Sequence, residues 1–229
     1  MIAGPNGSGK STLQAGLPDH WIGTFLNADN VQRSLESADG FDLASLDNAQ
    51  SRSAFERFVD RPGIRSRLTT SDRPYRFEGN RLRGEGSYFA AVVIEFLRYE
   101  LLRQRRSMTF ETVMSHRSKV DFLAEAHRHG YRTYLYFVAT RDPDINVRRV
   151  QLRVAQGGHD VPESKIRSRY ERSLGLLRDA VRQTDRAYLF DSSSGGSFED
   201  SLIAEITDGR RVELKTDFIP AWVQRHLLT

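Results

Sequence analysis

The first residues of the chain carry the pattern Gly4-x-x-x-x-Gly9-Lys10-Ser11, which is typical of loops that bind the phosphates of ATP or GTP. Glycines let backbone N–H groups turn toward phosphate oxygens, and the helix expected after the loop adds its partial positive charge. We expect Lys10 to reach the β- and γ-phosphates, and the Ser11 hydroxyl to hold Mg²⁺. The residues expected to contact the nucleotide here are Gly4, Pro5, Asn6, Gly7, Ser8, Gly9, Lys10, Ser11 and Thr12. The alternative is a degenerate loop, because only three residues precede Gly4 and the strand before it must be short.

Asp29 ends a short predicted strand, 24–29, next to the phosphate loop in any sheet of this kind. A carboxylate there can accept the proton of an acceptor hydroxyl, or hold the metal through water. The alternative is that Asp29 caps the helix expected from about Val31, because aspartate is a preferred N-cap. Position alone does not separate these two roles.

Glu111 and Thr112 end a second polar strand, predicted over 107–111, with His116 close behind. Polar groups at the carboxyl ends of parallel strands line the ligand crevice, so Glu111 is expected to bind a substrate hydroxyl or to assist Mg²⁺. The alternative is helix capping by Thr112 or Ser115. His116 by itself is more typical of a surface histidine.

Two helices predicted over 144–156 and 163–184 are joined by a glycine-containing loop, and both carry arginines. Such a hairpin can close as a lid, placing guanidinium groups on the transferred phosphoryl group and expelling water. The alternative is an ordinary helical hairpin with solvated arginines. The arginines of this set are Arg149, Arg153, Arg167, Arg169 and Arg172.

The elements that must position these residues alternate between strands and helices, which predicts a mostly parallel sheet covered on both faces. An Asp208-Gly209 pair between 202–207 and 210–214 predicts a hairpin near the end of the chain, followed by a last helix. We therefore expect a three-layer α/β sandwich of the P-loop NTPase type, with a helical lid and a C-terminal hairpin plus helix. Other predicted segments are helices at 42–60, 87–106 and 119–129 and strands at 131–140 and 186–191.

The stretch Arg61–Ser87 is polar and poor in apolar periodicity. It is predicted to be a long surface excursion, a small cap over the acceptor, or a disordered loop. The 229 residues suit one domain, 1–229, with a core of about 1–195, an insertion of about 61–87 and the C-terminal hairpin and helix at about 200–229.

Composition narrows the function classes. The chain has no cysteine, so disulfides, thiolate metal sites and cysteine nucleophiles are excluded. It shows no export signal and no apolar run of the roughly 20 residues that span a bilayer, so we expect a cytoplasmic protein without a membrane partner. Lys and Arg number 34 against 30 Asp and Glu, and only four are lysines. Without a basic run interleaved with aromatics, nucleic-acid binding is a minority interpretation.

Taken together, several segments resemble the zeta toxin family of P-loop kinases, whose founding members phosphorylate UDP-N-acetylglucosamine. The resemblance spans residues 3 to about 194, most of the chain. The glycine loop alone is shared by many families, whereas its combination with the later segments is more specific. The matching segments are 3–12, Asn27-Ala28-Asp29, Phe110-Glu111-Thr112-Val113-Met114-Ser115-His116, Gly157-Gly158-His159-Asp160-Val161-Pro162, Arg167 and Arg169-Tyr170-Glu171-Arg172-Ser173-Leu174.

The resemblance implies roles for individual residues. Asp29 would be the base that activates the acceptor hydroxyl, and the lid arginines Arg153 and Arg169 would hold the ATP phosphates. Glu111 and Thr112 would contact the acceptor. Separately from the resemblance, we also expect His116 and Arg172 to be substrate-binding residues. The sequence departs from the founding pattern because no glycine separates Glu111 from Thr112, and because the 61–83 excursion is longer.

We therefore expect an ATP- or GTP-dependent kinase that acts, with Mg²⁺, on a hydroxyl of UDP-N-acetylglucosamine or a related nucleotide sugar. One alternative is a kinase for another nucleotide, nucleoside or drug acceptor. Another is a nucleotide-gated ATPase or switch, although no strand ends in the Asp-Glu pair that such ATPases use. A third is a toxin-like protein silenced by an antitoxin partner.

Overall fold

In the computed structural model, the described residues form two compact units. The first unit comprises Met1–Trp21 and Glu111–Thr229, and the second comprises Ile22–Phe110. The assignment of one kinase domain with an insertion stays a prediction. The residues that the structure describes are 1–43, 51–68, 75–195 and 199–229.

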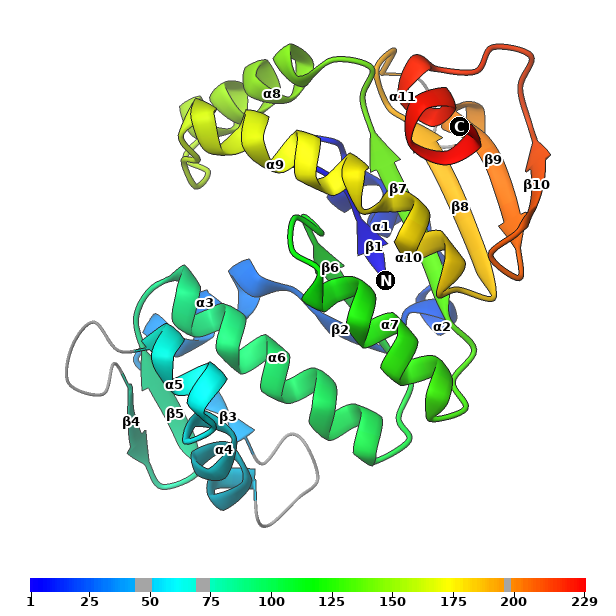
Figure 1. Cartoon of the computed structure of the whole chain (residues 1–229). Coiled ribbons are helices and arrows are strands. Elements are labelled where there is room, and N and C mark those ends of the chain that lie inside the picture. Colours follow the sequence, from blue (N-terminus) through cyan, green and yellow to red (C-terminus); the bar gives the residue numbers. More distant parts are fainter. Residues whose placement is uncertain (44–50, 69–74, 196–198) are drawn as a thin grey trace. The chain divides into compact units, whose positions relative to one another are not determined.

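The first unit is built on a mostly parallel sheet with the strand order β10-β9-β8-β7-β1-β6 (Figure 1). Neighbours from β8 to β6 run parallel, whereas β9 and β10 are antiparallel to their neighbours. This arrangement confirms the predicted α/β fold class and its C-terminal hairpin. The strand bounds are β1 Ile2–Ala3, β6 Met108–Thr112, β7 Tyr134–Ala139, β8 Arg186–Asp191, β9 Leu202–Thr207 and β10 Arg211–Leu214.

Strand β1 is only two residues long, as the sequence predicts, yet it lies in the middle of the sheet. Ile2 pairs with Glu111 on one side and with Tyr136 on the other, and it is fully buried. Gly4 continues the pairing by donating its N–H to the carbonyl of Thr112 at 3.2 Å. The phosphate loop therefore starts from an anchored strand.

Helices cover this sheet. Helices α7, α9 and α10 cross one face, where the alternating side chains Leu135, Phe137, Ala187 and Leu189 are fully buried (Figure 1). The helix predicted over 163–184 is in fact two helices, because α9 ends before Leu176. The bounds are α1 Lys10–Gly16, α2 Asp19–Ile22, α7 Ser118–Arg128, α8 Pro143–Ala155, α9 Glu163–Gly175, α10 Leu177–Arg182 and α11 Ala221–Val223, which a π-helical segment, Gln224–Leu228, extends.

The C-terminal hairpin closes at the predicted turn. Asp208 and Gly209 both adopt positive φ, 53° and 63°. Two consecutive left-handed residues are typical of the tight turn whose twist matches that of the flanking strands. The turn thereby fixes the register in which Val212 faces Ile206.

The second unit has its own small core. Helices α3 and α6 pack together, and Met108–Phe110 of β6 pair in parallel with β2. A three-stranded antiparallel sheet, β3-β5-β4, lies in the same unit. The fully buried Phe55 ring contacts Tyr75, Phe77, Phe89 and Phe96 edge to face. The bounds are β2 Thr24–Leu26, α3 Ala28–Glu36, β3 Phe41–Asp42, α4 Ser51–Val59, α5 Pro62–Leu68, β4 Tyr75–Glu78, β5 Arg81–Gly84 and α6 Ser87–Arg103.

This core excludes an unstructured loop for the described part of Arg61–Ser87, while the alternative of a cap over the acceptor stays a prediction. Its described residues form α5, β4 and β5, and their aromatic side chains pack on α4 and α6 rather than forming an unstructured excursion. Part of the stretch, 69–74, and the first part of the helix predicted over 42–60, 44–50, lie outside the described residues. Within the described part of the chain, no helix has the length and apolar character needed to cross a membrane.

Candidate functional site

The loop between β1 and α1 has a backbone path that only glycine can follow at two positions. Gly4 has φ of 146°, and a Cβ there would lie 2.0 Å from the carbonyl oxygen of Val138. Gly7 has φ of 72°, and its Cβ would lie 2.6 Å from the carbonyl oxygen of Asn146. Both positions therefore require glycine for conformation and for space.

The carbonyl groups of this loop are occupied by the protein itself. The carbonyls of Pro5, Asn6, Gly7 and Ser8 accept hydrogen bonds from side chains, and three of these four side chains come from distant parts of the first unit. As a result, these carbonyl oxygens face protein side chains and are not available to a ligand. The bonds are Lys10 Nζ to Pro5 O at 2.9 Å, Asn146 Nδ2 to Asn6 O at 2.6 Å, Arg149 Nη1 to Gly7 O at 3.5 Å and Ser192 Oγ to Ser8 O at 2.8 Å.

The N–H groups show the opposite behaviour. Among the described residues, no acceptor receives a hydrogen bond from the backbone N–H of Asn6, Gly7 or Gly9. Successive N–H groups left open in a loop that enters a helix form a concave site for anions. The loop thus has the polarity of a phosphate site.

Lys10 is the first residue of α1 and is 8% exposed. Its ammonium group lies 2.9 Å from the Pro5 carbonyl and 3.8 Å from Oε1 of Glu111. Because Glu111 lies one residue before the end of β6, beside β1, the predicted juxtaposition of this carboxylate with the loop is present. Ser11 and Thr12 follow at the start of α1 with exposed side chains.

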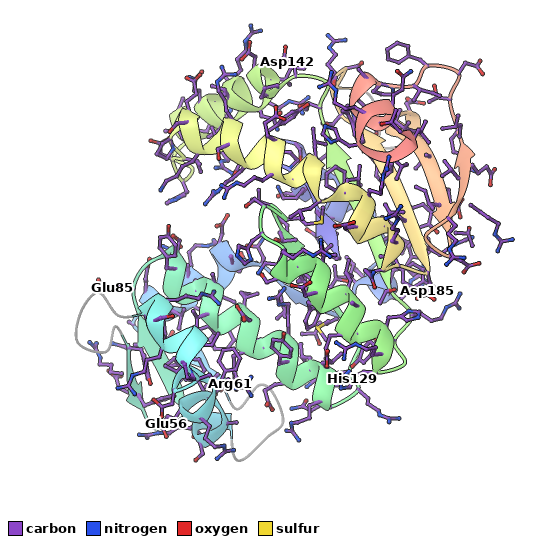
Figure 2. All side chains as sticks on the ribbon, viewed as in Figure 1. Glu56, Arg61, Glu85, His129, Asp142 and Asp185 are labelled. Atoms are coloured by element: carbon purple, nitrogen blue, oxygen red, sulfur yellow. The ribbon has the colours of Figure 1, made fainter. Side chains whose placement is uncertain are left out.

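Helix α8 supplies two of the groups that hold the loop. It begins at Asp142, labelled in Figure 2, whose carboxylate accepts a hydrogen bond from the N–H of Asp144, and Pro143 fills its first turn. One turn in, the fully buried Asn146 reaches Asn6, and its Oδ1 accepts a hydrogen bond from Thr140. A second turn places Arg149 against the loop.

Arg149 links the loop to the end of β8. It donates to the hydroxyl and the carbonyl of Ser192, at 2.9 and 2.6 Å. From α9, Nη1 of Arg169 lies 3.4 Å from Oδ1 of Asn6. One arginine of each helix of the predicted lid therefore contacts the phosphate loop.

Helix α9 is held in place by a buried phenol. Tyr170 donates to the carbonyl of Thr140 at 2.7 Å, and burial raises the pKa of the Tyr170 phenol, so it stays protonated. Val147 and Val150 of α8 pack on Ile166 of α9 and form the apolar seam between the two helices.

The other predicted arginines make contacts within the hairpin. Arg153 is exposed and donates to the carbonyl of His159 at 2.8 Å. Arg172 donates to the carbonyl of Ser168 on its own helix, and Arg167 pairs with Asp144 and Glu163. These contacts of the three arginines lie within the hairpin and not at the loop, and their predicted roles stay predictions.

Thr112 and His116 contact their own chain neighbours. The Thr112 hydroxyl accepts a hydrogen bond from the N–H of Met114 at 3.0 Å, which supports a turn in which Met114 has φ of 52°. His116 Nδ1 lies 3.0 Å from the Ser118 hydroxyl, just before α7. Their roles toward an acceptor stay predictions.

Asp29 belongs to the second unit and lies in the first turn of α3 with an exposed carboxylate. The helix cap is Asn27, whose Oδ1 accepts hydrogen bonds from the N–H groups of Asp29 and Asn30 at 2.9 and 3.2 Å. The interpretation of Asp29 as an N-cap is therefore wrong, because Asn27 occupies that position. A pocket of about 240 Å³ in this unit is lined by Asn27 and Asn30 together with apolar residues of β2, α3 and α6.

Two residues that hold the loop, Asn146 and Ser192, have no place in the sequence predictions. A signal for Asn146 exists, because it interrupts the apolar face Ile145, Val147, Val150 of a helix that is otherwise packed. Ser192 offers no such signal, since serine after a strand is common.

The loop residues fit a nucleotide with Mg²⁺. Ser11 offers an exposed hydroxyl next to the anion site, which is the ligand that such loops supply, while magnesium keeps several waters and phosphate oxygens as its other ligands. Within the described residues, no group of three or more His, Asp or Glu side chains forms a metal cluster.

Two solved structures are similar to this chain. One is a chain from the chromosomal PezAT toxin–antitoxin system of the human pathogen Streptococcus pneumoniae; it is 14% identical, the match covers 98% of this chain and 79% of that one, and the TM-score is 0.50. The other comes from the crystal structure of AvrRxo1-ORF1:AvrRxo1-ORF2 with sulphate ions. It is 12% identical, the match covers 94% of this chain and 60% of that one, and the TM-score is 0.54.

No family model matches the sequence, and no curated protein matches it. At 14% and 12% identity, the two likenesses concern the fold. They agree with the geometry above: the chain has an α/β fold with a mostly parallel sheet flanked by helices and a C-terminal hairpin, similar to that of a chain from a toxin–antitoxin system.

Proposed function

We propose that the chain is a kinase that transfers the γ-phosphoryl group of ATP, or of GTP, to a hydroxyl group of a small acceptor. The observation that carries the proposal is the difference between the carbonyl groups and the N–H groups of the 4–10 loop in their hydrogen bonding. Its carbonyls are occupied by Lys10, Asn146, Arg149 and Ser192, whereas the N–H groups of Asn6, Gly7 and Gly9 donate to none of the described residues. An anion is the ligand that satisfies those donors.

Lys10 would bind the β- and γ-phosphates. Its ammonium group is desolvated and held at the loop by one carbonyl, so its charge is positioned before the nucleotide arrives. Ser11 would hold Mg²⁺, which would neutralise phosphate charge when bound. Arg169 of α9 would add a second cation from the lid, and Arg153 would join it after leaving the carbonyl of His159.

The acceptor half of the reaction is assigned by resemblance and chemistry. Asp29 would take the proton of the acceptor hydroxyl, a role left open by the finding that Asn27, not Asp29, caps α3. Glu111, Thr112, His116 and Arg172 would contact the acceptor. UDP-N-acetylglucosamine or a related nucleotide sugar is the first acceptor we propose.

The toxin–antitoxin setting of one similar structure supports a further part of the proposal. We expect an antitoxin protein as a partner of this chain, and a cytoplasmic location, where nucleotide sugars are made. The resemblance of the sequence to zeta toxins points the same way.

The test is nucleotide turnover by the purified protein with Mg-ATP, with and without UDP-N-acetylglucosamine. Acceptor-dependent ADP release and recovery of a phosphorylated sugar nucleotide are expected. Lys10→Ala and Asp29→Ala should abolish both. The matched controls are Lys165→Ala, an exposed lysine on α9, and Asp19→Ala, an exposed first-turn aspartate of α2, and both should retain turnover.

Each failure has a distinct meaning. ATP binding without ADP release, across a panel of nucleotide acceptors, would overturn the kinase proposal in favour of a switch. If a different acceptor is phosphorylated and both variants lose activity, only the nucleotide-sugar assignment is overturned.

A further inference from the structure

The outermost strand of the first unit, β10, has an open edge. It pairs with β9 alone among the described strands, and Figure 1 shows it as the last strand of the sheet. Unpaired N–H and C=O groups along such an edge can pair with another strand. The hairpin turn at Asp208-Gly209 holds β10 in one register, so the edge presents a fixed set of side chains.

One face of this edge is apolar. Val212 and Leu214 lie opposite Ile206 and Ala204, which are fully buried, so they belong to the core face of the sheet. They are nevertheless 40% and 42% exposed, and Phe218 beyond the strand is 74% exposed. The core face of the sheet therefore extends to the edge, where the described residues cover its side chains only in part.

The other face carries opposite charges on either side of Val212. Arg211 is 77% exposed and pairs with Asp208, and Glu213 is 70% exposed and pairs with Lys215. Ion pairs at such exposure contribute little to stability, so they do not prevent either residue from taking a new partner. The residues on either side of Val212 thus carry opposite charges, so an antiparallel copy of this segment centred on Val212 places each charge opposite its complement.

We propose that β10 pairs with β10 of a second copy of this chain, antiparallel and with the two-fold axis at Val212. In this register Arg211 lies opposite the second copy's Glu213, and Glu213 lies opposite the second copy's Arg211. Directly opposed side chains interact, and the symmetry makes each favourable pair occur twice. Val212 meets its own counterpart, and the apolar faces of both sheets stay on the same side.

Neighbouring registers that keep these faces aligned are disfavoured by the same charges. A two-fold axis at Glu213 would oppose the two copies of Glu213 and would place Arg211 against Lys215 of the second copy. An axis at Arg211 would oppose the two arginines. Like charges directly opposite are destabilising in a sheet, so the charge pattern selects the register centred on Val212.

The experiment is sedimentation equilibrium of the whole chain over a range of concentrations, at low and high salt. The wild type should show a concentration-dependent dimer. Glu213→Arg and Arg211→Glu should each lower the association constant roughly tenfold, because each turns two attractive pairs into two repulsive ones. The double variant Arg211→Glu with Glu213→Arg should restore the dimer, since the exchanged charges again face their opposites.

The control is Glu85→Arg, which makes the same change of charge on an exposed glutamate of the second unit and should leave association unchanged (Figure 2). Circular dichroism melting verifies that each variant is folded. A chain that stays monomeric at all concentrations overturns the proposal. So does a dimer that the single exchanges do not weaken, or one that the double exchange does not restore.

Discussion

Each unit of the molecule contains a buried basic side chain, and the two side chains have different surroundings. Lys10 in the first unit is 8% exposed and lies at a glycine loop in which the N–H groups of Asn6, Gly7 and Gly9 donate to none of the described residues. Arg98 in the second unit is 1% exposed and lies 4.7 Å from the centre of the Phe110 ring, on a helix lined with valine, leucine and phenylalanine. Burial lowers the pKa of the Arg98 guanidinium to about 10, which leaves it charged at neutral pH.

A buried cationic side chain therefore does not by itself indicate a functional site. The ammonium group of Lys10 contacts the Pro5 carbonyl and lies 3.8 Å from the Glu111 carboxylate, in a loop whose Asn6, Gly7 and Gly9 N–H groups donate to none of the described residues. Arg98 is instead part of the packing: its aliphatic stem and planar head fill the space between α6 and Phe110, as arginine does on aromatic faces. The groups around a buried cation, rather than its charge, indicate whether it belongs to a functional site or to the packed interior.

The largest effect is expected for Lys10→Met. If the chain is the kinase proposed above, kcat should fall at least a hundredfold because the proposed transition-state cation is lost, while the denaturation midpoint changes little. Turnover and urea unfolding of the same preparation measure the two. If Lys10→Met retained activity, Lys10 would not be the residue that binds the phosphates. The proposed functional difference between Lys10 and Arg98 would then be wrong.

The converse is expected for Arg98→Ala. It should lower the free energy of unfolding by about 3 kcal/mol, because a large side chain is removed from a packed interior. Arg98→Met, which keeps most of the volume, should cost less. Urea unfolding gives the values, and activity per folded molecule should stay unchanged in both variants. Reduced activity in fully folded Arg98→Met would mean that the arginine also takes part in the site.

A smaller effect is expected for Gly7→Ala. The added Cβ would lie 2.6 Å from the carbonyl of Asn146 at a residue with φ of 72°, so a loss of about 1–3 kcal/mol and weaker nucleotide binding should follow. Gly130→Ala is the matched control, since Gly130 has φ of 80° and nothing within 4 Å of a Cβ. Equal losses for both would show that conformation, and not the contact with α8, is the cause.

The smallest expected effect is on stability, and it concerns a polar cluster outside both the loop and the packing around Arg98. Asp185, labelled in Figure 2, accepts hydrogen bonds from the N–H and hydroxyl of Thr133 at 2.7 and 2.9 Å. Burial alone would raise the pKa of Asp185, but the hydrogen bonds from Thr133 and the nearby His127 outweigh it, so the pKa is lowered on folding.

A carboxylate with a lowered pKa stabilises the fold above its unfolded pKa, about 3.9, and this contribution is lost as the pH falls through the lower folded value. Asp185→Asn should therefore cost about 1 kcal/mol at pH 7, and the difference from the wild type should shrink below about pH 4. Urea unfolding at several pH values measures it. A difference that is constant with pH would contradict the assignment.

The sequence was sufficient for the features that depend on local chemistry. The glycine loop, its strand and helix, the turn at Asp208-Gly209 and the alternation of strands and helices follow from spacing and from residues with special backbone freedom. The short first strand was also expected. These are cases in which a few neighbouring residues decide the outcome.

What could not be predicted depends on residues that meet only in the folded chain. Asn146 and Ser192 hold loop carbonyls from positions about 140 and 184 residues away along the sequence. Capping by Asp29 was one alternative because the helix was expected to begin at about Val31, whereas α3 begins at Ala28 and its cap is Asn27. Likewise, the polar stretch 61–87 forms regular elements because its few aromatics pack on Phe55 and Phe89.

The anchoring of the phosphate loop has a consequence for synthesis of the protein. Strand β1 needs partners at residues 111–112 and 136–137, and the loop needs Asn146 and Ser192. Chains grow from the N-terminus, so the loop emerges from the ribosome well before Asn146 and Ser192, the residues that complete its contacts. The nascent chain therefore carries the loop without the groups that hold its carbonyls, and a message truncated before the codon for Ser192 yields a product with an incomplete set of loop contacts.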